Sequence, residues 1–303
     1  NLMANAIKAK FLEVLAERFG TPRKLNQSLS LYVIGEDTAR IYIRYSKVHD
    51  GHRTFYGLRD EDLQQLEGHP SLICFLWDNQ KEPLFIRFAD YEEVFHSASP
   101  AGDGQYKVQI YPQDGATELY VARAGRFNVE GNFGWSELEQ ILSAKAAGEI
   151  PALTHSQVQT LLGAIGIAKG FDVWIPMYDR GRLDWSMSSP FLCQNSLPQG
   201  YQEVEKIIQE IDVIWMQRGS SELRALFEVE HSTPIYSGLL RFNDLHLVTP
   251  RLRPRFSVVA NDARRELFVR QLNRPTFRLS GLNELCTFLD YRDVFGWHTR
   301  INR

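Results

Sequence analysis

The sequence predicts a protein of two domains that both mix helices and strands. The chain has 303 residues, which is long for a single domain. Short β-branched and aromatic runs recur through both halves, and amphipathic helical segments separate them. The first half is typical of an α+β domain rich in antiparallel strands. The second half predicts an α+β or α/β core in the order αβββαβ.

The first domain is expected over residues 1–150. A helix over 5–19 begins it, because apolar side chains recur there at helical spacing. Alternating or wholly apolar runs predict strands at 30–35, 39–46, 71–77, 84–89, 105–111 and 118–123. Further helices are expected over 60–68, 90–97 and 135–147.

The second domain is expected over residues 151–303, after a change of composition at 148–151. Thr154 is a favourable N-cap for a helix over 155–169, and Gly170 is a favourable end for it. The remaining pattern predicts strands at 171–176, 211–217, 224–230 and 256–260. It predicts helices over 200–210, 234–247, 262–272 and 281–295.

The charge balance argues against a generally basic nucleic-acid binder. The formal net charge is −3, made up of −5 over residues 1–150 and +2 over the remainder. Any surface for nucleic acid must therefore be a local patch. The three cysteines are far apart and form no CxxC pair, which fits a reducing cytoplasm. No apolar run reaches the ~18 residues that span a bilayer, and we expect no membrane association.

The segment from Asp212 to Glu230 carries the strongest indication of chemistry. Two strand-like arms flank a Gly/Ser turn at 219–221, which suits a hairpin. Glu228 and Glu230 share one face of the second arm, and pairing can bring Asp212 beside them. Three carboxylates on apolar strands are costly unless a cation neutralises them. Hard oxygen ligands suit Mg²⁺, with Mn²⁺ as a substitute, and such a site suits phosphodiester hydrolysis.

Other interpretations of the same residues remain open. Glu228 and Glu230 could form the solvated face of an amphipathic strand. Asp172 is a rival for Asp212, since FDVW resembles IDVIW, although no acidic partner lies at hairpin distance from it. Glu205 could add a carboxylate from the preceding helix, but an exposed position is the simpler interpretation. The same holds for Gln157 and Gln159, which could face the site but are more typical of a polar surface.

From residue 154 onward the element order resembles the core of the PD-(D/E)xK nucleases, the restriction-endonuclease-like superfamily. In that family an Asp begins the second core strand, and an acidic residue, any residue and a Lys lie on the third. Asp212 and Glu228 match the two acidic positions. Glu230 stands where most members have Lys, so the pattern resembles the minority D…ExE variant. The chain also resembles, more specifically, a widespread set of bacterial restriction-endonuclease-like domains. This resemblance rests on the runs at 170–174, 227–233, 237–241 and 274–277, and it covers about residues 155–295.

The resemblance and the chemistry together imply roles for these residues. Asp212, Glu228 and the carbonyl group of Val229 would hold the metal ion, and Glu230 would accept a water proton or hold a second ion. Arg241 is expected to hold the phosphate as a bidentate donor. His231 points to the strand face opposite Glu230, so we expect it to support the site only from behind.

The segment from Arg40 to Arg59 is the best candidate for DNA recognition in the first domain. Basic residues there interleave with aromatic ones, and the candidate contacts are Arg40, Tyr42, Arg44, Lys47 and Arg53. Basic groups can hold phosphates while aromatic rings stack on bases. An ordinary amphipathic hairpin explains the same pattern. His49 and His52 are a weak metal signal, and a solvated loop is the simpler interpretation.

These observations favour a metal-dependent endonuclease of the type II restriction kind, specific for a sequence or a base modification in double-stranded DNA. Cutting both strands usually needs two active sites, so a homodimer is expected. The alternative is a nuclease fold that has lost activity and binds DNA or regulates, which the missing Lys motivates. A third possibility is a nuclease for RNA or single strands.

Overall fold

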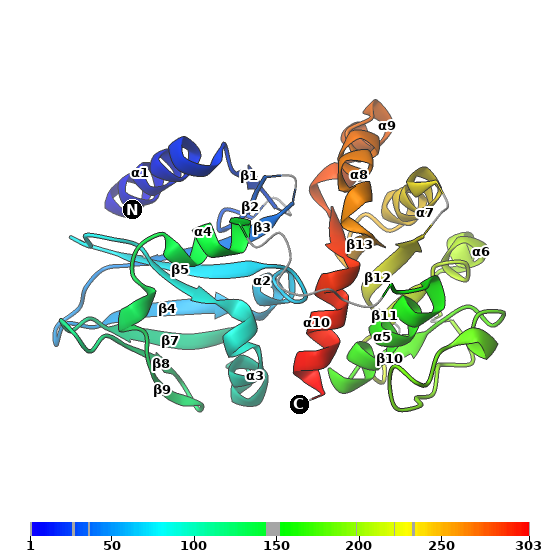
Figure 1. Ribbon diagram of the computed structural model, residues 1–303, viewed down its shortest axis with the longest axis horizontal. Helices are drawn as coiled ribbons and strands as arrows, with labels where there is room; N and C mark the ends of the chain where they lie inside the picture. The colour runs from blue at the N-terminus through cyan, green and yellow to red at the C-terminus, as the bar shows by residue number, and fades with distance from the viewer. Residues whose placement is uncertain are drawn as a thin grey trace. The chain divides into compact units, whose positions relative to one another are not determined.

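The computed structural model describes residues 2–25, 28–35, 37–143, 152–197, 199–220, 222–231 and 234–302. It forms two compact units, Asn1–Ala147 and Gly148–Arg303 (Figure 1). The expected domain boundary at 148–151 falls outside the described residues. In the described part of the chain, no helix is long and apolar enough to cross a membrane.

Two sheets form the first unit. The first has the order β1-β2-β3-β5-β6 and the second β4-β7-β8-β9. β3 and β5 are parallel, and the other neighbours are antiparallel, as the sequence predicted for this half. The strands are β1 (Arg23–Lys24), β2 (Leu31–Ile34), β3 (Ala39–Ser46), β4 (Thr54–Arg59), β5 (Ser71–Trp77), β6 (Leu84–Arg87), β7 (Gln105–Tyr111), β8 (Glu118–Val121) and β9 (Gly125–Asn128). The helices are α1 (Leu2–Phe19), α2 (Asp60–Gln64), α3 (Phe88–Ala98), a 3₁₀ turn η1 (Glu130–Asn132) and α4 (Ser136–Ser143).

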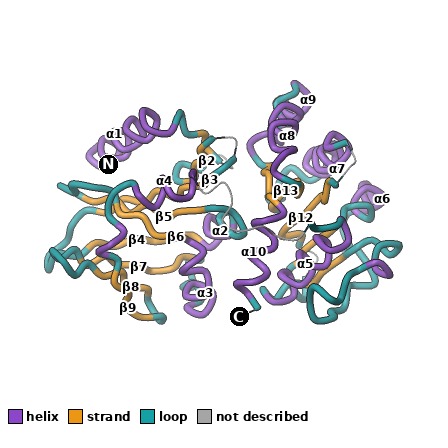
Figure 2. Tube along the Cα trace, in the orientation of Figure 1, coloured by secondary structure: helices purple, strands orange, loops and turns teal. Residues whose placement is uncertain are grey.

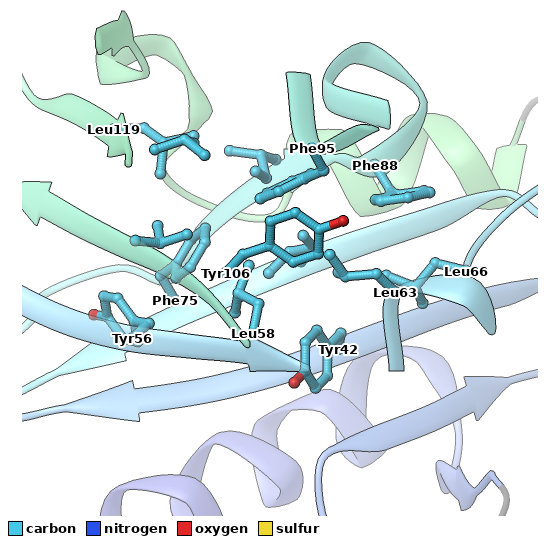
Figure 3. Packing of buried hydrophobic residues seen from close by; sticks show 14 of the residues in the cluster. Tyr42, Tyr56, Leu58, Leu63, Leu66, Phe75, Phe88, Phe95, Tyr106 and Leu119 are labelled. Atoms are coloured by element: carbon cyan, nitrogen blue, oxygen red, sulfur yellow. The ribbon is translucent and has the colours of Figure 1, made fainter. Parts of the chain in front are cut away.

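Both faces of the first sheet are covered. One face packs with the second sheet and α3 in a core that includes Tyr42, Tyr56 and Phe75, as Figure 3 shows. The other face packs against α1 and α4. A strand covered on both faces is apolar along its whole length, which explains the continuous apolar run of β5.

The segment 40–59 does not form one hairpin. β3 pairs with β2 and β5 in the first sheet, whereas β4 pairs with β7 in the second. The interpretation of 40–59 as an ordinary hairpin is therefore wrong. The partner of β4 is β7, which lies about 50 residues later, so no short window of sequence indicates this pairing. The turn at 47–53 would suit a hairpin between β3 and β4 equally well.

The second unit contains one five-stranded sheet of order β10-β11-β12-β13-β14. Helices lie on both sides of this sheet and give three layers (Figure 2). The strands are β10 (Asp172–Trp174), β11 (Val213–Met216), β12 (Leu223–Glu230), β13 (Arg255–Ala260) and β14 (Cys286–Asp290). The helices are α5 (His155–Ala168), α6 (Glu205–Ile208), α7 (Ile235–Val248), α8 (Arg265–Leu272), α9 (Pro275–Ser280) and α10 (Tyr291–Ile301). Short 3₁₀ turns are η2 (Arg180–Arg182), η3 (Gln202–Val204), η4 (Asp262–Arg264) and η5 (Leu282–Glu284).

The helices divide between the two faces of this sheet. α5 and α10 pack on the face that carries Phe227 and Val229. α6, α7, α8 and α9 pack on the other face, with Leu226 and Val258. The order α5, β10, β11, β12, α7, β13 reproduces the αβββαβ order that the sequence predicted, and Thr154 caps α5 as expected, in a capping box with Gln157.

The expected helix over 281–295 is wrong. Residues Cys286–Asp290 form β14, which is parallel to β13 and buried at all five positions, and α10 begins only at Tyr291. A short apolar run fits a buried strand and a buried helix equally well by periodicity. Pairing with β13 decides between them here.

Candidate active site

The β11–β12 hairpin brings the predicted carboxylates together. Val213 lies opposite Phe227, which places Asp212, one residue earlier, beside Glu228. Glu228 and Glu230 lie on the face of β12 that packs against α7, as strand alternation predicted. Both are buried, with exposed fractions of 0% and 2%. The interpretation of these two side chains as a solvated strand face is therefore wrong.

Asp212 is held by two different elements. Its Oδ2 atom accepts a hydrogen bond of 2.7 Å from the backbone N–H of Val229 on β12. Its Oδ1 atom lies 3.3 Å from Nε2 of His155, in the first turn of α5. The carboxylate thus bridges the strand pair and the helix, and its side chain remains 14% exposed.

Arg241 on α7 binds Glu228 through both carboxylate oxygens. The guanidinium donates from Nε at 2.7 Å and from Nη2 at 2.8 Å, a bidentate geometry that gives strong charge-assisted hydrogen bonds. Burial raises the pKa of Glu228 to about 8, against the opposing effect of Arg241, and the nearby charge of Asp212 adds to the increase. Arg241 therefore balances a carboxylate that the interior disfavours.

Close approach of α7 to β12 depends on Gly238. A Cβ atom at this position would lie 2.9 Å from Oε1 of Glu230 and 3.0 Å from Cβ of Glu228. Any larger side chain would push the helix away from the two glutamates. The Ser-Gly-Leu-Leu-Arg run thus has two linked purposes: its glycine lets the helix approach, and its arginine pairs with Glu228.

An open pocket of about 480 Å³ lies over these residues. Its lining is His155, Tyr178, Glu210, Asp212, Val229, Glu230, His231, Pro234, Ser237 and Arg241. Asp212 and Glu230 face this pocket directly, whereas Glu228 is buried beneath Arg241. The pocket lining therefore includes three carboxylates, one guanidinium and two imidazole rings.

Three polar residues of the site were not assigned to it from the sequence. His155 faces the pocket, and although burial alone would lower its pKa, the hydrogen bond and charge of Asp212 raise it. Gln159 is fully buried and donates from Nε2 to the backbone carbonyl of Asp212 at 3.2 Å and to Oδ2 of Asp179 at 3.0 Å. Asp179 is itself buried. A glutamine in the mostly apolar stretch 158–167 was the available signal, and the interpretation of Gln159 as an exposed polar residue was wrong.

The rival carboxylates lie elsewhere. Asp172 pairs with Met216, at the end of β11 remote from Asp212, and its Oδ1 atom lies 3.8 Å from Nε of Arg218. Glu205 is exposed on α6, as the simpler interpretation held. Gln157 contributes to the cap of α5 and donates to Asp184 at 3.0 Å.

His231 follows the last residue of β12 and lines the same pocket as Glu230, so the expectation that it would support the site only from the opposite strand face is wrong. Its ring stacks on that of Tyr291, with centroids 6.4 Å apart and an interplanar angle of 7°. Burial raises the pKa of Tyr291, and the charges of Glu230 and Asp212 act in the same direction. His231 therefore lines the pocket with its ring stacked on that of Tyr291.

The donor atoms match a hard divalent cation in kind. Asp212 and Glu230 present carboxylates to the pocket, and a third carboxylate, that of Glu228, is buried beneath Arg241. Across the described residues, no three His, Cys, Asp or Glu side chains are arranged closely enough to hold a metal ion. In addition, both carboxylate oxygens of Glu228 accept hydrogen bonds from Arg241.

The candidate DNA contacts of the first unit divide into buried and exposed residues. Arg40 is fully buried, and its guanidinium lies 3.3 Å from both carboxylate oxygens of Asp37 and donates to the carbonyl of Gln65. Tyr42 is also fully buried, as Figure 3 shows, and its hydroxyl accepts from the N–H of Arg59. The expectation that Arg40 and Tyr42 face DNA is therefore wrong.

The other three candidates reach the surface. Arg44 is half-buried, with its guanidinium 5.7 Å from the ring centroid of Tyr42. Lys47 and Arg53 are exposed in and beside the turn between β3 and β4. The guanidinium of Arg53 stacks over Phe55 at 5.2 Å. These three residues stay candidates for DNA contact.

Comparison with known proteins places the second unit in a family. Residues 139–298 match the family of the type II restriction enzyme NmeDI C-terminal domain, which is more than half of the chain. The type II restriction enzyme NmeDI of Neisseria meningitidis serogroup C is 32% identical over 134 residues, which are 41% of this chain and 37% of that enzyme. The match thus spans little more than a third of the length of this relative. No solved structure matches the chain. The chain belongs to the NmeDI C-terminal domain family.

Proposed function

We propose that this member of the NmeDI C-terminal domain family is a type II-like restriction endonuclease that hydrolyses DNA phosphodiester bonds. The observation that carries the proposal is a group of three carboxylates within the matched region: Asp212 and Glu230 line one open pocket, and Glu228 is buried next to them under Arg241. Three carboxylates around an open polar pocket suit metal-assisted hydrolysis of an anionic substrate.

The site corresponds to the D…ExE form of the PD-(D/E)xK pattern. Asp212 and Glu228, with the carbonyl of Val229, would hold Mg²⁺ or, as a substitute, Mn²⁺. When bound, the ion would neutralise phosphate charge and lower the pKa of its water. Glu230 faces the pocket and would accept the proton of the attacking water.

Arg241 and His155 complete the proposed chemistry from the protein side. Arg241 lines the pocket while it binds Glu228, so its guanidinium can meet a substrate phosphate at the pocket mouth. His155 holds Asp212 from α5, and the N–H of Val229 holds it from β12. These contacts fix the Asp212 carboxylate before substrate binds, which lowers the cost of organising the site.

The first unit would contribute target recognition, through Arg44, Lys47 and Arg53 at the turn between β3 and β4. We further propose that the protein acts as a homodimer on double-stranded DNA, because each copy offers one such pocket and a duplex has two strands. Specificity of cleavage for a DNA sequence or for a base modification is part of the same proposal.

A second candidate function is DNA binding without cleavage. Glu230 stands at the position where most members of the resembling superfamily carry Lys, and Arg241 already engages both oxygens of Glu228. A nuclease fold with these features could serve as a binding or regulatory protein.

Cleavage of plasmid and phage DNA with Mg²⁺ or Mn²⁺ separates the two functions. Unmodified, cytosine-methylated and hydroxymethylated DNA would be compared. Glu228→Ala should abolish cleavage and preserve DNA binding, because it removes a carboxylate from the site. Glu222→Ala is the matched control, since Glu222 precedes the same strand with a side chain that is 53% exposed. Cleavage retained by purified Glu228→Ala would refute the assignment, and binding without cleavage by the unaltered chain would favour the second function.

A further inference from the structure

Arginines concentrate in one short part of the second unit. Residues 250–280 contain eight arginines and no lysine, against two acidic residues, Asp262 and Glu266, which gives a net charge of +6. The whole chain carries −3, so the remaining residues sum to −9. This stretch is therefore a basic segment in an otherwise acidic chain. A nucleic-acid surface on a protein of negative net charge must be a local basic patch of this kind.

Within this stretch, the arginines differ in exposure and pairing. Arg270 on α8, Arg274 just before α9 and Arg278 on α9 are exposed, whereas Arg255, the first residue of β13, is buried. Arg265 is partly neutralised, because its Nε lies 2.8 Å from Asp262. In the described structure, Arg270 and Arg278 pair with no carboxylate. Exposed guanidinium groups without acidic partners remain available to an anionic ligand.

This surface adjoins the candidate active site. α8 and α9 pack on the same sheet face as α7, and Figures 1 and 2 show the three helices as neighbours. The guanidinium of Arg274 lies 4.7 Å from the ring centroid of Tyr236, in the first turn of α7. The next residue, Ser237, lines the pocket. A ligand that occupies the pocket and extends past Tyr236 would therefore reach Arg274 and then Arg278 or Arg270.

Duplex DNA has the charge to match this surface. It carries one negative charge per ~1.7 Å of helix axis, so a strand entering the pocket continues as a line of phosphates. Arginine binds phosphate through two parallel N–H donors. Resting on the nuclease function proposed above, we propose that Arg270, Arg274 and Arg278 form a phosphate-backbone surface that holds the DNA strand beside the scissile bond.

The test is the salt dependence of DNA binding by the full chain. Binding of a short fluorescein-labelled DNA duplex, without divalent metal, would be measured by anisotropy from ~50 to ~200 mM KCl. The variant is R270A/R274A/R278A. The control is R182A/R218A/R251A, which removes the same charge from three exposed arginines of this unit. Arg251 follows the C-terminal end of α7, about 20 Å along that helix from Tyr236.

Each phosphate contact contributes ~0.9 to the slope of log affinity against log salt concentration, so loss of three contacts lowers the slope by up to about 2.7. We expect such a decrease, and at least about tenfold weaker binding, in the α8–α9 variant, with the slope of the control almost unchanged. With cleavage substrates, KM should rise while kcat is largely kept, because the site itself is intact. Circular dichroism would confirm that both variants are folded.

The outcomes distinguish this surface from the proposed function. DNA binding by the unaltered chain, with the same slope in the α8–α9 variant, would overturn the surface and leave the nuclease assignment intact. Absence of DNA binding and cleavage by the unaltered chain would overturn both. Tighter binding of an RNA duplex than of DNA, lost in the α8–α9 variant, would overturn the assignment to DNA.

Discussion

Two strands with alternating polar and apolar residues, β12 and β3, differ in where their polar side chains lie. On β12, the alternation places Glu228 and Glu230 beside an open pocket, under a helix that approaches through Gly238. On β3, the same kind of alternation places Arg40 and Tyr42 in the interior, where they bind Asp37, Gln65 and Arg59. Alternation decides which side chains share a face. What covers that face decides whether they form a site or a structural contact.

The largest effect should come from removing the buried cation of the first unit. Arg40→Ala leaves Asp37 as a buried carboxylate without this partner, and we expect a loss of about 3–5 kcal/mol in the free energy of unfolding. Arg53→Ala is the control, because exposed substitutions usually change stability by less than about 0.5 kcal/mol. Urea denaturation measures both. A stable Arg40→Ala protein with weakened DNA binding would show that Arg40 contacts DNA and is not a structural residue of the interior.

Gly238→Ala should disturb the site through packing alone. The added methyl group would lie within 3.0 Å of both glutamates, so we expect a loss of about 1–3 kcal/mol and strongly reduced cleavage. Gly296→Ala in α10 is a matched helical control, since its nearest new contact is Nη1 of Arg300 at 3.4 Å. Alanine is the better helix former by up to about 1 kcal/mol, so the control should be neutral or stabilising. If thermal unfolding shows that Gly238→Ala and Gly296→Ala change stability equally, the close approach of α7 to β12 does not require a glycine at position 238.

Gln159→Leu should produce the smallest effect on stability and a distinct one on activity. The change removes hydrogen bonds to the carbonyl of Asp212 and to Asp179, so we expect a loss of about 1–2 kcal/mol. If Gln159 positions Asp212, kcat should fall while KM for DNA stays nearly constant. Gln157→Leu is the control, because Gln157 donates to Asp184 instead. If kcat is unchanged in Gln159→Leu, Gln159 contributes to stability and does not position Asp212 for catalysis.

Most elements of the fold were predictable because their signals are local. β3, β5 and β7 have the bounds that their alternating or apolar runs indicated, and Thr154 and Gly170 delimit α5 as capping chemistry requires. Gly170 has φ +85°, a conformation that glycine adopts without strain. β4, β9 and β14 were missed or misassigned. Each depends on pairing with a strand that no short window of sequence reveals.

The candidate site shows the same division. Asp212, Glu228 and Glu230 could be assembled from the sequence, because a hairpin register and strand alternation relate their positions directly. His155 and Asp179 could not be, and Gln159 was only one possibility, because these residues lie some 30 to 60 positions before Asp212. His155 and Gln159 meet Asp212 only when α5 packs on the sheet, and Asp179 is held there by Gln159.

By itself, the sequence determined the periodicity of the strands, the caps of α5 and the grouping of three acidic side chains on one hairpin. Only the tertiary structure decided that Arg40 and Tyr42 are interior, that 286–290 is a strand, and that Arg241 binds Glu228 across α7 and β12. The reason is physical: backbone periodicity is a property of neighbouring residues, whereas burial and charge pairing depend on which distant surfaces come into contact.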